Sequence, residues 1–359
     1  LGNVDRIINL GCNPAYDGGA DLNWASNAKD KTAFRLSHFA EDESSEAPGV
    51  AAPRAHYLES WGDDFPEPGV GFSVGAVSQP VVSPLYNTRG TGDIILDLAR
   101  RMGSSSVMPW QNMEEFLKYG WRRIYQRGDS QTLAQGFDAF WTSVLKAGAW
   151  GETTNGSTAF TLNPDVIAGI GVAPPEFSGS EEGYPFILHP YLSPNFHDGR
   201  GANLPWMQEL PDPMTSVVYG SWVEVNPVTA EEMGLSEGDL VDIQSPHGQL
   251  RVPVFVYPAI MPNVIAIPIG QGHGEYGRYA KGRGVNPIEI LSPLLEPITG
   301  NLASSATRVN LTPTGGRVKL VKTGGVSRDL GRDIVQHTSL GVEVSSAADN
   351  SIPITEVTT

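Results

Sequence analysis

The second half of the chain alternates apolar and polar residues with a period of two, the pattern of half-buried β-strands. Leu240–Gln244 and Gln249–Val254 flank the turn Pro246-His247-Gly248, and this arrangement predicts a β-hairpin. Further strands are predicted at Trp222–Asn226, Asn263–Ile269 and Ala306–Leu311.

Strands this short cannot be stable by themselves. Ordering about 35 residues costs on the order of 35 to 70 kcal/mol of backbone entropy, whereas burying about ten aliphatic side chains stabilises by roughly 15 to 30 kcal/mol. We therefore expect the strands to close into a small barrel, which also removes exposed sheet edges. The side chains expected to fill its core are Val241, Ile243, Val252, Val254, Ile265 and Ile267.

A short helix is predicted at Thr229–Met233, between the first two of these strands. Thr229 and Glu232 have the spacing of a capping box, in which each side chain bonds the backbone near the other, and Gly234 is expected to end the helix.

The first half of the chain has the pattern of an α/β domain. Arg6–Leu10 and Thr32–Leu36 are predicted strands, and Gly11-Cys12-Asn13-Pro14 forms a turn at the end of the first. This turn can present backbone amides to a nucleotide, or it can be an ordinary connection. Helices are predicted at Asp21–Ala28, Thr91–Gly103, Pro109–Gln126 and Phe137–Lys146. A stretch rich in Gly, Thr, Ser and Pro from Glu152 to Gly183 marks the domain boundary.

Composition excludes several classes of function. Forty acidic residues against 24 basic ones give a net charge of −16, which disfavours nucleic acid and anionic membrane surfaces as main partners. No apolar run approaches the roughly 18 to 20 residues that a membrane helix needs. Cys12 is the only cysteine, so the chain can form neither an internal disulfide nor the cage of an iron–sulfur cluster. Neither a metal-ligand set nor a hydrolase signature is recognisable, and we expect no metal site and no catalytic residue.

The most specific motif lies between Trp222 and Gly248, which reads WVEVNPVTAEEMGLSEGDLVDIQSPHG. It resembles the opening of the molybdopterin-dinucleotide-binding domain of the dimethyl-sulfoxide-reductase superfamily. The matching residues are Asn226, Pro227, Ala230, Gly234, Gly238, Asp239 and Gly248, followed by Gly270–Gly274 and Val285–Pro287. Ile8–Pro14 is similar to the superfamily strand and Asn-Pro turn that lead toward the nucleotide end of the cofactor.

A narrower resemblance rests on three segments, HYLESWGD (residues 56–63), VVSPLY (81–86) and DGRGANLPWMQELPDPMT (198–215). They are similar to the large iron–sulfur and molybdopterin-like subunit of alternative complex III. The resemblance implies an α/β domain over residues 1–175, a double-psi β-barrel over 184–314 and a polar tail or linker over 315–359.

The resemblance also implies a site. The expected cofactor-binding residues are Asn13, Pro14, Gly270, Gly272, His273 and Asn286, and the cofactor is molybdopterin guanine dinucleotide, in a cradle that can also be empty. Three glycines within Gly270–Gly274 permit close approach to a ligand or to a neighbouring chain segment. His273 can bond a pterin or pyrophosphate oxygen, or it can be a structural loop residue; Asn286 can read a base edge or form a turn. Arg200 can bind a phosphate, although a surface ion pair is the more ordinary role. We expect the loops at Asn13, at Gly270–His273 and at Asn286 to converge on one cleft.

Two functions follow from the resemblance. The first is a scaffold module in respiratory electron transfer, within a quinol-oxidising membrane complex whose iron–sulfur clusters lie on segments outside this chain. The alternative is the cofactor-binding half of a catalytic molybdenum oxidoreductase of polysulfide, nitrate or formate type. In either case the partners are other subunits of a membrane-bound redox complex, without a direct membrane span. The expected location is the periplasmic face, through those subunits, and this chain alone is expected to catalyse nothing.

Overall fold

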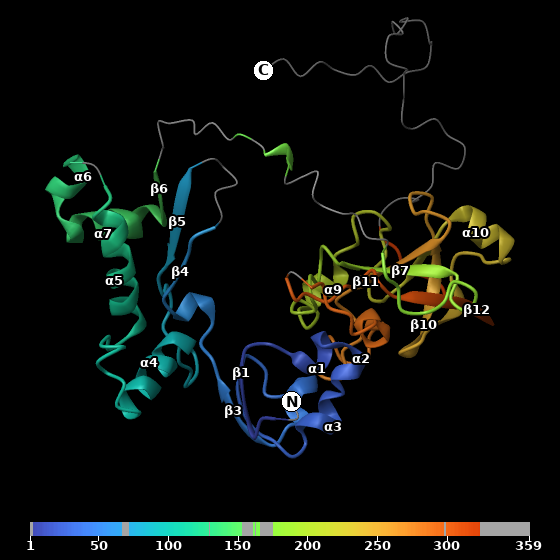
Figure 1. Cartoon of the computed structure of the whole chain (residues 1–359), viewed down its shortest axis with the longest axis horizontal. Helices are drawn as coiled ribbons and strands as arrows, with labels where there is room; N and C mark the ends of the chain where they lie inside the picture. The colour runs from blue at the N-terminus through green and yellow to red at the C-terminus, as the bar shows by residue number, and fades with distance from the viewer. Residues whose placement is uncertain are drawn as a thin grey trace, which may run out of the picture.

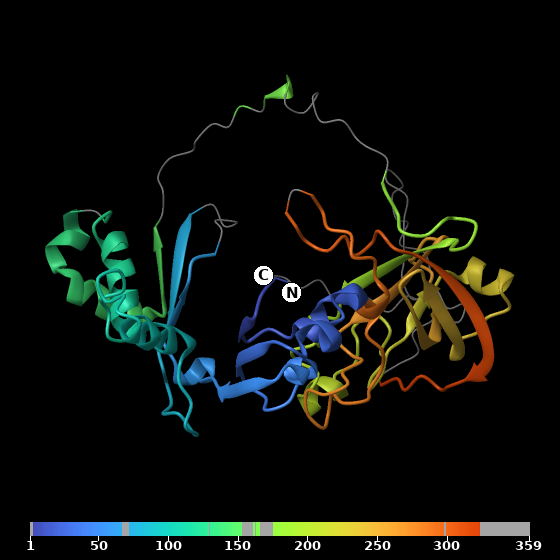
Figure 2. The same ribbon diagram turned by 60° about the horizontal axis from the view of Figure 1, so that its bottom comes forward.

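The computed structural model describes residues 3–66, 72–128, 130–152, 161, 163–165, 175–297 and 299–323. Within these ranges the chain forms two three-stranded sheets and one closed barrel. Figures 1 and 2 show the first sheet lying between a helical lobe and the barrel.

The first sheet is parallel, as expected for an α/β arrangement. It consists of β1 (Arg6–Leu10), β2 (Thr32–Ser37) and β3 (Gly49–Pro53), in that order. The helix predicted at Asp21–Ala28 is divided, because Asn23 adopts a left-handed backbone conformation with φ of 39°. The short helices between β1 and β2 are therefore α1 (Pro14–Asp17), α2 (Gly19–Leu22) and α3 (Trp24–Ala28).

The second sheet is antiparallel and belongs to a separate lobe, so residues 1–175 do not form one continuous α/β sheet. Its strands are β4 (Gly62–Asp64), β5 (Ser73–Ser78) and β6 (Ala149–Glu152). Four helices accompany it: α4 (Thr91–Arg101), α5 (Met113–Tyr125), α6 (Ser130–Gln135) and α7 (Phe137–Ala147). The second sheet and its helices form a separate lobe because they have their own hydrophobic core, in which Trp121, Phe140 and Trp141 are buried together.

The barrel contains six strands in the closed order β10-β8-β11-β7-β12-β9. All six side chains expected in its core are buried, none more than 1% exposed, which confirms that prediction. The predicted hairpin is also confirmed, with Val252 opposite Val241. The double-psi path of the chain remains an expectation. The strands are β7 (Phe186–Leu192), β8 (Val223–Val225), β9 (Asp239–Ser245), β10 (Gly248–Val256), β11 (Val264–Ile269) and β12 (Arg308–Arg317).

The helix after β8, α10 (Pro227–Glu232), begins differently from the prediction. Asn226 rather than Thr229 is its N-cap, because the Asn226 Oδ1 accepts a hydrogen bond from the Val228 N–H at 2.8 Å. Pro227 fits the first helical position since it has no N–H to satisfy. Thr229 instead donates its hydroxyl to the Pro262 carbonyl.

Part of the predicted polar tail belongs to the barrel. The last strand extends to Arg317, which pairs with Asp239, and beyond it the Val218 N–H donates to the Val321 carbonyl. These ladder and backbone bonds hold residues 315–323 against the barrel. Residues 324–359, and most of the boundary stretch predicted from Glu152 to Gly183, lie outside the described residues.

Candidate functional site

The predicted loops meet where the N-terminal segment packs against the barrel. Asn13 and Pro14 follow β1, Gly270–His273 follow β11, and Asn286 precedes the short 3-10 helix η3 (Pro287–Ile290). Hydrogen bonds join these segments, since Asn13 and His273 both contact Glu43 and the Asn286 amide donates to the Tyr16 carbonyl, so the loops do meet. The expected single cleft is formed only in part: Asn13 and His273 line one cavity, whereas Asn286 is 1% exposed. Their role as cofactor ligands stays a prediction. We call this junction the seam, and it comprises Asn13, Tyr16, Glu43, His273, Tyr276 and Asn286.

His273 occupies the centre of the seam and is only 2% exposed. Its ring stacks on Tyr16, with centroids 3.9 Å apart, and on Tyr276, with centroids 4.8 Å apart. Its Nδ1 lies 3.1 Å from the Glu43 Oε1, and its Nε2 lies 3.2 Å from the Gly199 carbonyl oxygen. Both partners are acceptors, so both contacts are hydrogen bonds only when the imidazole carries two protons.

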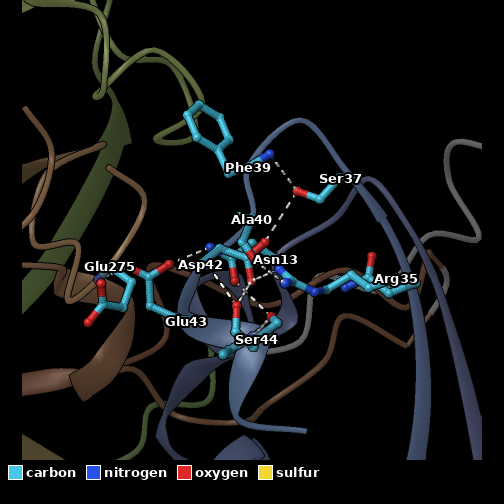
Figure 3. A network of polar contacts seen from close by, with 12 residues as sticks. Asn13, Arg35, Ser37, Phe39, Ala40, Asp42, Glu43, Ser44 and Glu275 are labelled. Carbon is cyan, nitrogen blue, oxygen red and sulfur yellow. Dashed lines mark hydrogen bonds and ion pairs between the residues drawn. The ribbon is translucent and has the colours of Figure 1, made fainter. Parts of the chain in front are cut away.

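Glu43 joins the segments from the N-terminal side. It begins the 3-10 helix η1 (Glu43–Glu46), and its carboxylate accepts hydrogen bonds from the Asn13 amide and from the Glu275 N–H (Figure 3). Burial by itself would raise the pKa of this carboxyl. The hydrogen bonds from His273, Asn13 and Glu275 outweigh that effect and hold the pKa at about 2.

The remaining side chains of the seam are also satisfied within the protein. The Asn286 amide donates to the Tyr16 carbonyl at 2.9 Å, and its Oδ1 accepts from the Ile288 N–H. The Tyr16 hydroxyl donates to the Gln271 carbonyl at 2.8 Å. The Asn13 Oδ1 accepts from the Ser44 hydroxyl. Polar groups in all three predicted loops are therefore bonded to protein.

The glycines after β11 are required by the packing of the chain on itself. A Cβ built on Gly272 would lie 2.1 Å from the Asn286 nitrogen, and one on Gly270 would lie 2.5 Å from the Phe196 Cβ. Both glycines also have positive φ, of 86° and 122°. Of the two interpretations of this glycine-rich loop, the close approach of a neighbouring segment is the one that the structure supports.

Two cavities adjoin the seam. The larger has a volume of about 640 Å³, and the described residues that line it include six carboxylates and no lysine or arginine. The carboxylates belong to Glu41, Asp42, Glu43, Glu46, Glu275 and Glu289. Such a lining repels a pyrophosphate.

The smaller cavity, of about 420 Å³, lies over the turn after β1 and is lined by Arg54 and Arg200 as well as by Asp17, Asp42 and Asp198. Arg54 approaches Gly11 so closely that a Cβ there would clash with the guanidinium. Within the described part of the chain, Arg54 makes no ion pair or side-chain hydrogen bond. Arg200 also lines this cavity, but Asp198 holds it through hydrogen bonds of 2.8 and 2.6 Å, so the ion pair expected for Arg200 is present.

Sequence reasoning missed several of these residues. Glu43 stands in the acidic run Glu41-Asp42-Glu43, which is typical of a solvated loop, and its histidine partner is 230 residues away. Tyr16 and Tyr276 carry no motif. Arg54 carries no motif either, and the strand that precedes it, β3, was not predicted.

The six predicted residues do not fit as direct ligands of a pterin dinucleotide. The side chains of Asn13, His273 and Asn286 are bonded to other protein groups, and Gly270 and Gly272 pack against the chain. Pro14 begins α1 and has no N–H to offer. A bound anion would have to use the Arg54 side of the smaller cavity.

Comparison with known proteins places these observations in a family context. Residues 205–307 match the family described as the Molydopterin dinucleotide binding domain. The chain is 27% identical over 271 residues to the menaquinone reductase, molybdopterin-binding-like subunit, of Nitratidesulfovibrio vulgaris, covering 75% of this chain and 36% of that protein. It is 36% identical over 111 residues to the arsenate respiratory reductase molybdopterin-containing subunit of a Shewanella species, covering 30% of this chain and 13% of that protein.

Among solved structures, acetylene hydratase from Pelobacter acetylenicus superposes with a TM-score of 0.64 at 17% sequence identity, covering 86% of this chain and 44% of that one. This likeness shows the fold alone. The sequence matches support the molybdopterin oxidoreductase superfamily, and the chain spans about a third of the menaquinone reductase subunit. No helix among the described residues is long and apolar enough to cross a membrane. In the same ranges, no three His, Cys, Asp or Glu side chains are grouped to hold a metal.

Proposed function

We propose that this chain is a scaffold module of a membrane-bound, quinol-oxidising respiratory complex similar to alternative complex III. In this proposal the module keeps the shape of a molybdopterin-dinucleotide-binding domain and uses it to join subunits. Iron–sulfur clusters lie on segments outside this chain, and the complex faces the periplasm. The name of the Nitratidesulfovibrio relative, a molybdopterin-binding-like subunit of a menaquinone reductase, supports assembly into a quinone-linked complex.

The observation that carries the proposal is the internal satisfaction of the seam. A cofactor cradle needs donors and acceptors that remain available to the ligand. Here the His273 ring lies between the Glu43 carboxylate and the Gly199 carbonyl, at 3.1 and 3.2 Å, while Asn286 bonds Tyr16 and Ile288. Displacing these partners would leave polar groups buried without hydrogen bonds, which costs about 1 to 3 kcal/mol each. The hydrogen-bonded arrangement of the seam is therefore more stable than one in which these side chains are released to bind a cofactor.

The decisive experiment measures cofactor content and turnover together. The full-length subunit is reconstituted with molybdenum cofactor, and its molybdenum and oxidised pterin are quantified per protein. It is then assayed with quinol, polysulfide, nitrate and formate. The proposal expects substoichiometric pterin and no turnover on this subunit, in the unmodified protein as in His273→Ala and Asn286→Ala. Stoichiometric pterin with turnover that collapses in both variants would contradict the scaffold function.

A second function is favoured by the turn after β1. Arg54 has no ion-pair partner in the described ranges, and the Asn9 Nδ2 beneath the same turn is buried without a hydrogen-bond partner there. These two features suit an anionic ligand over Gly11–Asn13, such as the guanine dinucleotide form of the cofactor. The chain would then be the cofactor-binding half of a polysulfide, nitrate or formate-type molybdenum oxidoreductase. Loss of bound pterin in Arg54→Ala, with retention in Arg123→Ala, at an exposed position of α5 outside both regions, would favour this function over the first.

A further inference from the structure

A loop at residues 81–86 presents large apolar side chains to solvent. Val81 is 65% exposed, Leu85 is 76% exposed and Tyr86 is 75% exposed, and Tyr57 beside them is 66% exposed. Exposed apolar residues scattered singly are ordinary, but several gathered on one ordered loop are typical of an interaction site. We call Tyr57, Leu58, Val81, Val82, Leu85 and Tyr86 the apolar loop surface.

The loop is fixed by hydrogen bonds although it belongs to no sheet. The N–H groups of Val81 and Val82 both donate to the Leu58 carbonyl, at 2.9 and 3.2 Å. The Glu59 carboxylate accepts from the Leu85 N–H at 2.9 Å and from the Thr88 hydroxyl at 3.2 Å. A surface held in one shape before binding loses less conformational entropy when a partner docks.

A cluster of arginines follows this loop in the sequence. Arg89, Arg100 and Arg101 all pair with the single carboxylate of Asp97, at 3.4, 3.2 and 3.1 Å. Three guanidinium groups therefore face two carboxylates on this surface, those of Asp97 and Glu59, which leaves a local excess of one positive charge in a chain whose net charge is −16. Arginine beside exposed aromatic and aliphatic residues is the composition of a protein–protein interface.

We propose that the apolar loop surface and the Asp97 arginine cluster together dock a partner protein subunit that presents an apolar patch edged by carboxylates. This inference rests on the proposed function as a scaffold and names the part of the chain that does the joining. Charge complementarity selects carboxylates on the partner, since guanidinium groups held by Asp97 keep further N–H donors for them.

The same observations weigh against two other occupants. An anionic membrane is a poor occupant because this surface itself carries the carboxylates of Glu59 and Asp97, which would face the lipid headgroups, whereas charges more than about 8 Å away are largely screened. A second copy would have to offer carboxylates beside an apolar patch. Its acidic cavity at Glu41–Glu46 offers carboxylates near the exposed apolar row Ile8, Phe34 and Val50 of the first sheet, but docking there would be a head-to-tail contact that propagates into a ring or filament instead of closing a dimer.

The test uses the complex purified through a tag on this chain, with subunit stoichiometry read by native mass spectrometry. Leu85→Asp and Tyr86→Asp should each lower the partner subunit recovered with this chain at least tenfold. Met261→Asp is the matched control, because Met261 is also exposed, at 64%, but lies on a barrel loop. Arg101→Ala should lower recovery at low salt and make little difference at high salt. Circular dichroism and melting temperature of each isolated variant should match the unmodified chain.

Each other outcome has a distinct meaning. Full partner recovery in both Asp variants overturns the inference. A change in the oligomeric state of the isolated chain instead assigns the surface to a second copy. Lost binding to vesicles of phosphatidylglycerol and phosphatidylethanolamine, with partner recovery intact, assigns it to lipid. Pterin content is measured on the same samples, so stoichiometric pterin with a tenfold loss of partner would defeat the scaffold function and leave the docking surface standing.

Discussion

The seam makes a sharp prediction about Glu43. Glu43→Gln keeps the size and most of the hydrogen-bonding shape of the side chain but removes its charge from beside His273, which is 2% exposed. The Glu43 carboxylate accepts hydrogen bonds from the Asn13 amide and the Glu275 N–H, and hydrogen bonds to charged groups contribute about 1.5 to 3 kcal/mol each. The depressed pKa gives a similar figure, because a fall from 4.5 to about 2 corresponds to about 3 kcal/mol at about 1.4 kcal/mol per pH unit. We expect the substitution to destabilise the seam by about 3 kcal/mol.

The assay must be local, because a chain with two lobes and a barrel need not unfold in one step. Hydrogen exchange measured by mass spectrometry on peptides covering residues 13–46 and 271–286 reports opening of the seam directly. A loss of about 3 kcal/mol should accelerate exchange there roughly a hundredfold. Glu46→Gln is the control, since Glu46 is exposed on the same 3-10 helix. Equal exchange in the two variants would refute the reasoning that the Glu43 carboxylate holds the seam closed.

Three further predictions follow from the same structure. Because the pKa of Glu43 is lowered, the stabilisation from its carboxylate is complete above about pH 4.5 and is lost as the pH falls toward about 2. The difference in hydrogen-exchange protection of the seam between the unmodified chain and Glu43→Gln should therefore shrink from pH 6 to pH 3. A difference that stays constant over this range would contradict the prediction. Gly272→Ala should lower the free energy of unfolding in urea by about 2 kcal/mol or more, because the added Cβ would lie 2.1 Å from the Asn286 nitrogen. The control Gly274→Ala, whose Cβ would have nothing within 4 Å, should change it by less than about 0.5 kcal/mol. Val252→Ala should cost about 1 to 3 kcal/mol in barrel unfolding, since Val252 is 1% exposed, and a negligible cost would mean that its site is poorly packed.

The barrel was the most predictable part of the structure because its signal is local. Alternation along β9 and β10 fixes which side chains face the core, and the turn between them fixes their register. Strand β7 escaped prediction because His189 and Pro190 interrupt its apolar pattern. Its place in the barrel depends on pairing with β11 and β12, which are distant in sequence.

The candidate site was predictable in position but not in its chemistry. Motifs located Asn13 and His273 after predicted strands and Asn286 before Pro287, and these three segments do meet, although Asn286 begins a 3-10 helix and does not follow a strand. What occupies those side chains depends on Glu43 and Tyr16, whose partners lie 230 to 270 residues away. No local pattern encodes such pairings, so the sequence could not distinguish a histidine that faces a ligand from one enclosed by protein.

That distinction bears on how a cofactor domain can become a scaffold. A cradle emptied of its ligand leaves buried donors and acceptors that destabilise the fold unless other groups satisfy them. The seam supplies such groups from the N-terminal segment, with Glu43 and Asn13 on one side and His273 on the other. The hydrogen bonds that occupy the groups a pterin would use also hold the first sheet against the barrel. Restoring an open cradle would therefore require loosening the seam, so cofactor binding and the attachment of the two regions should be antagonistic in this chain.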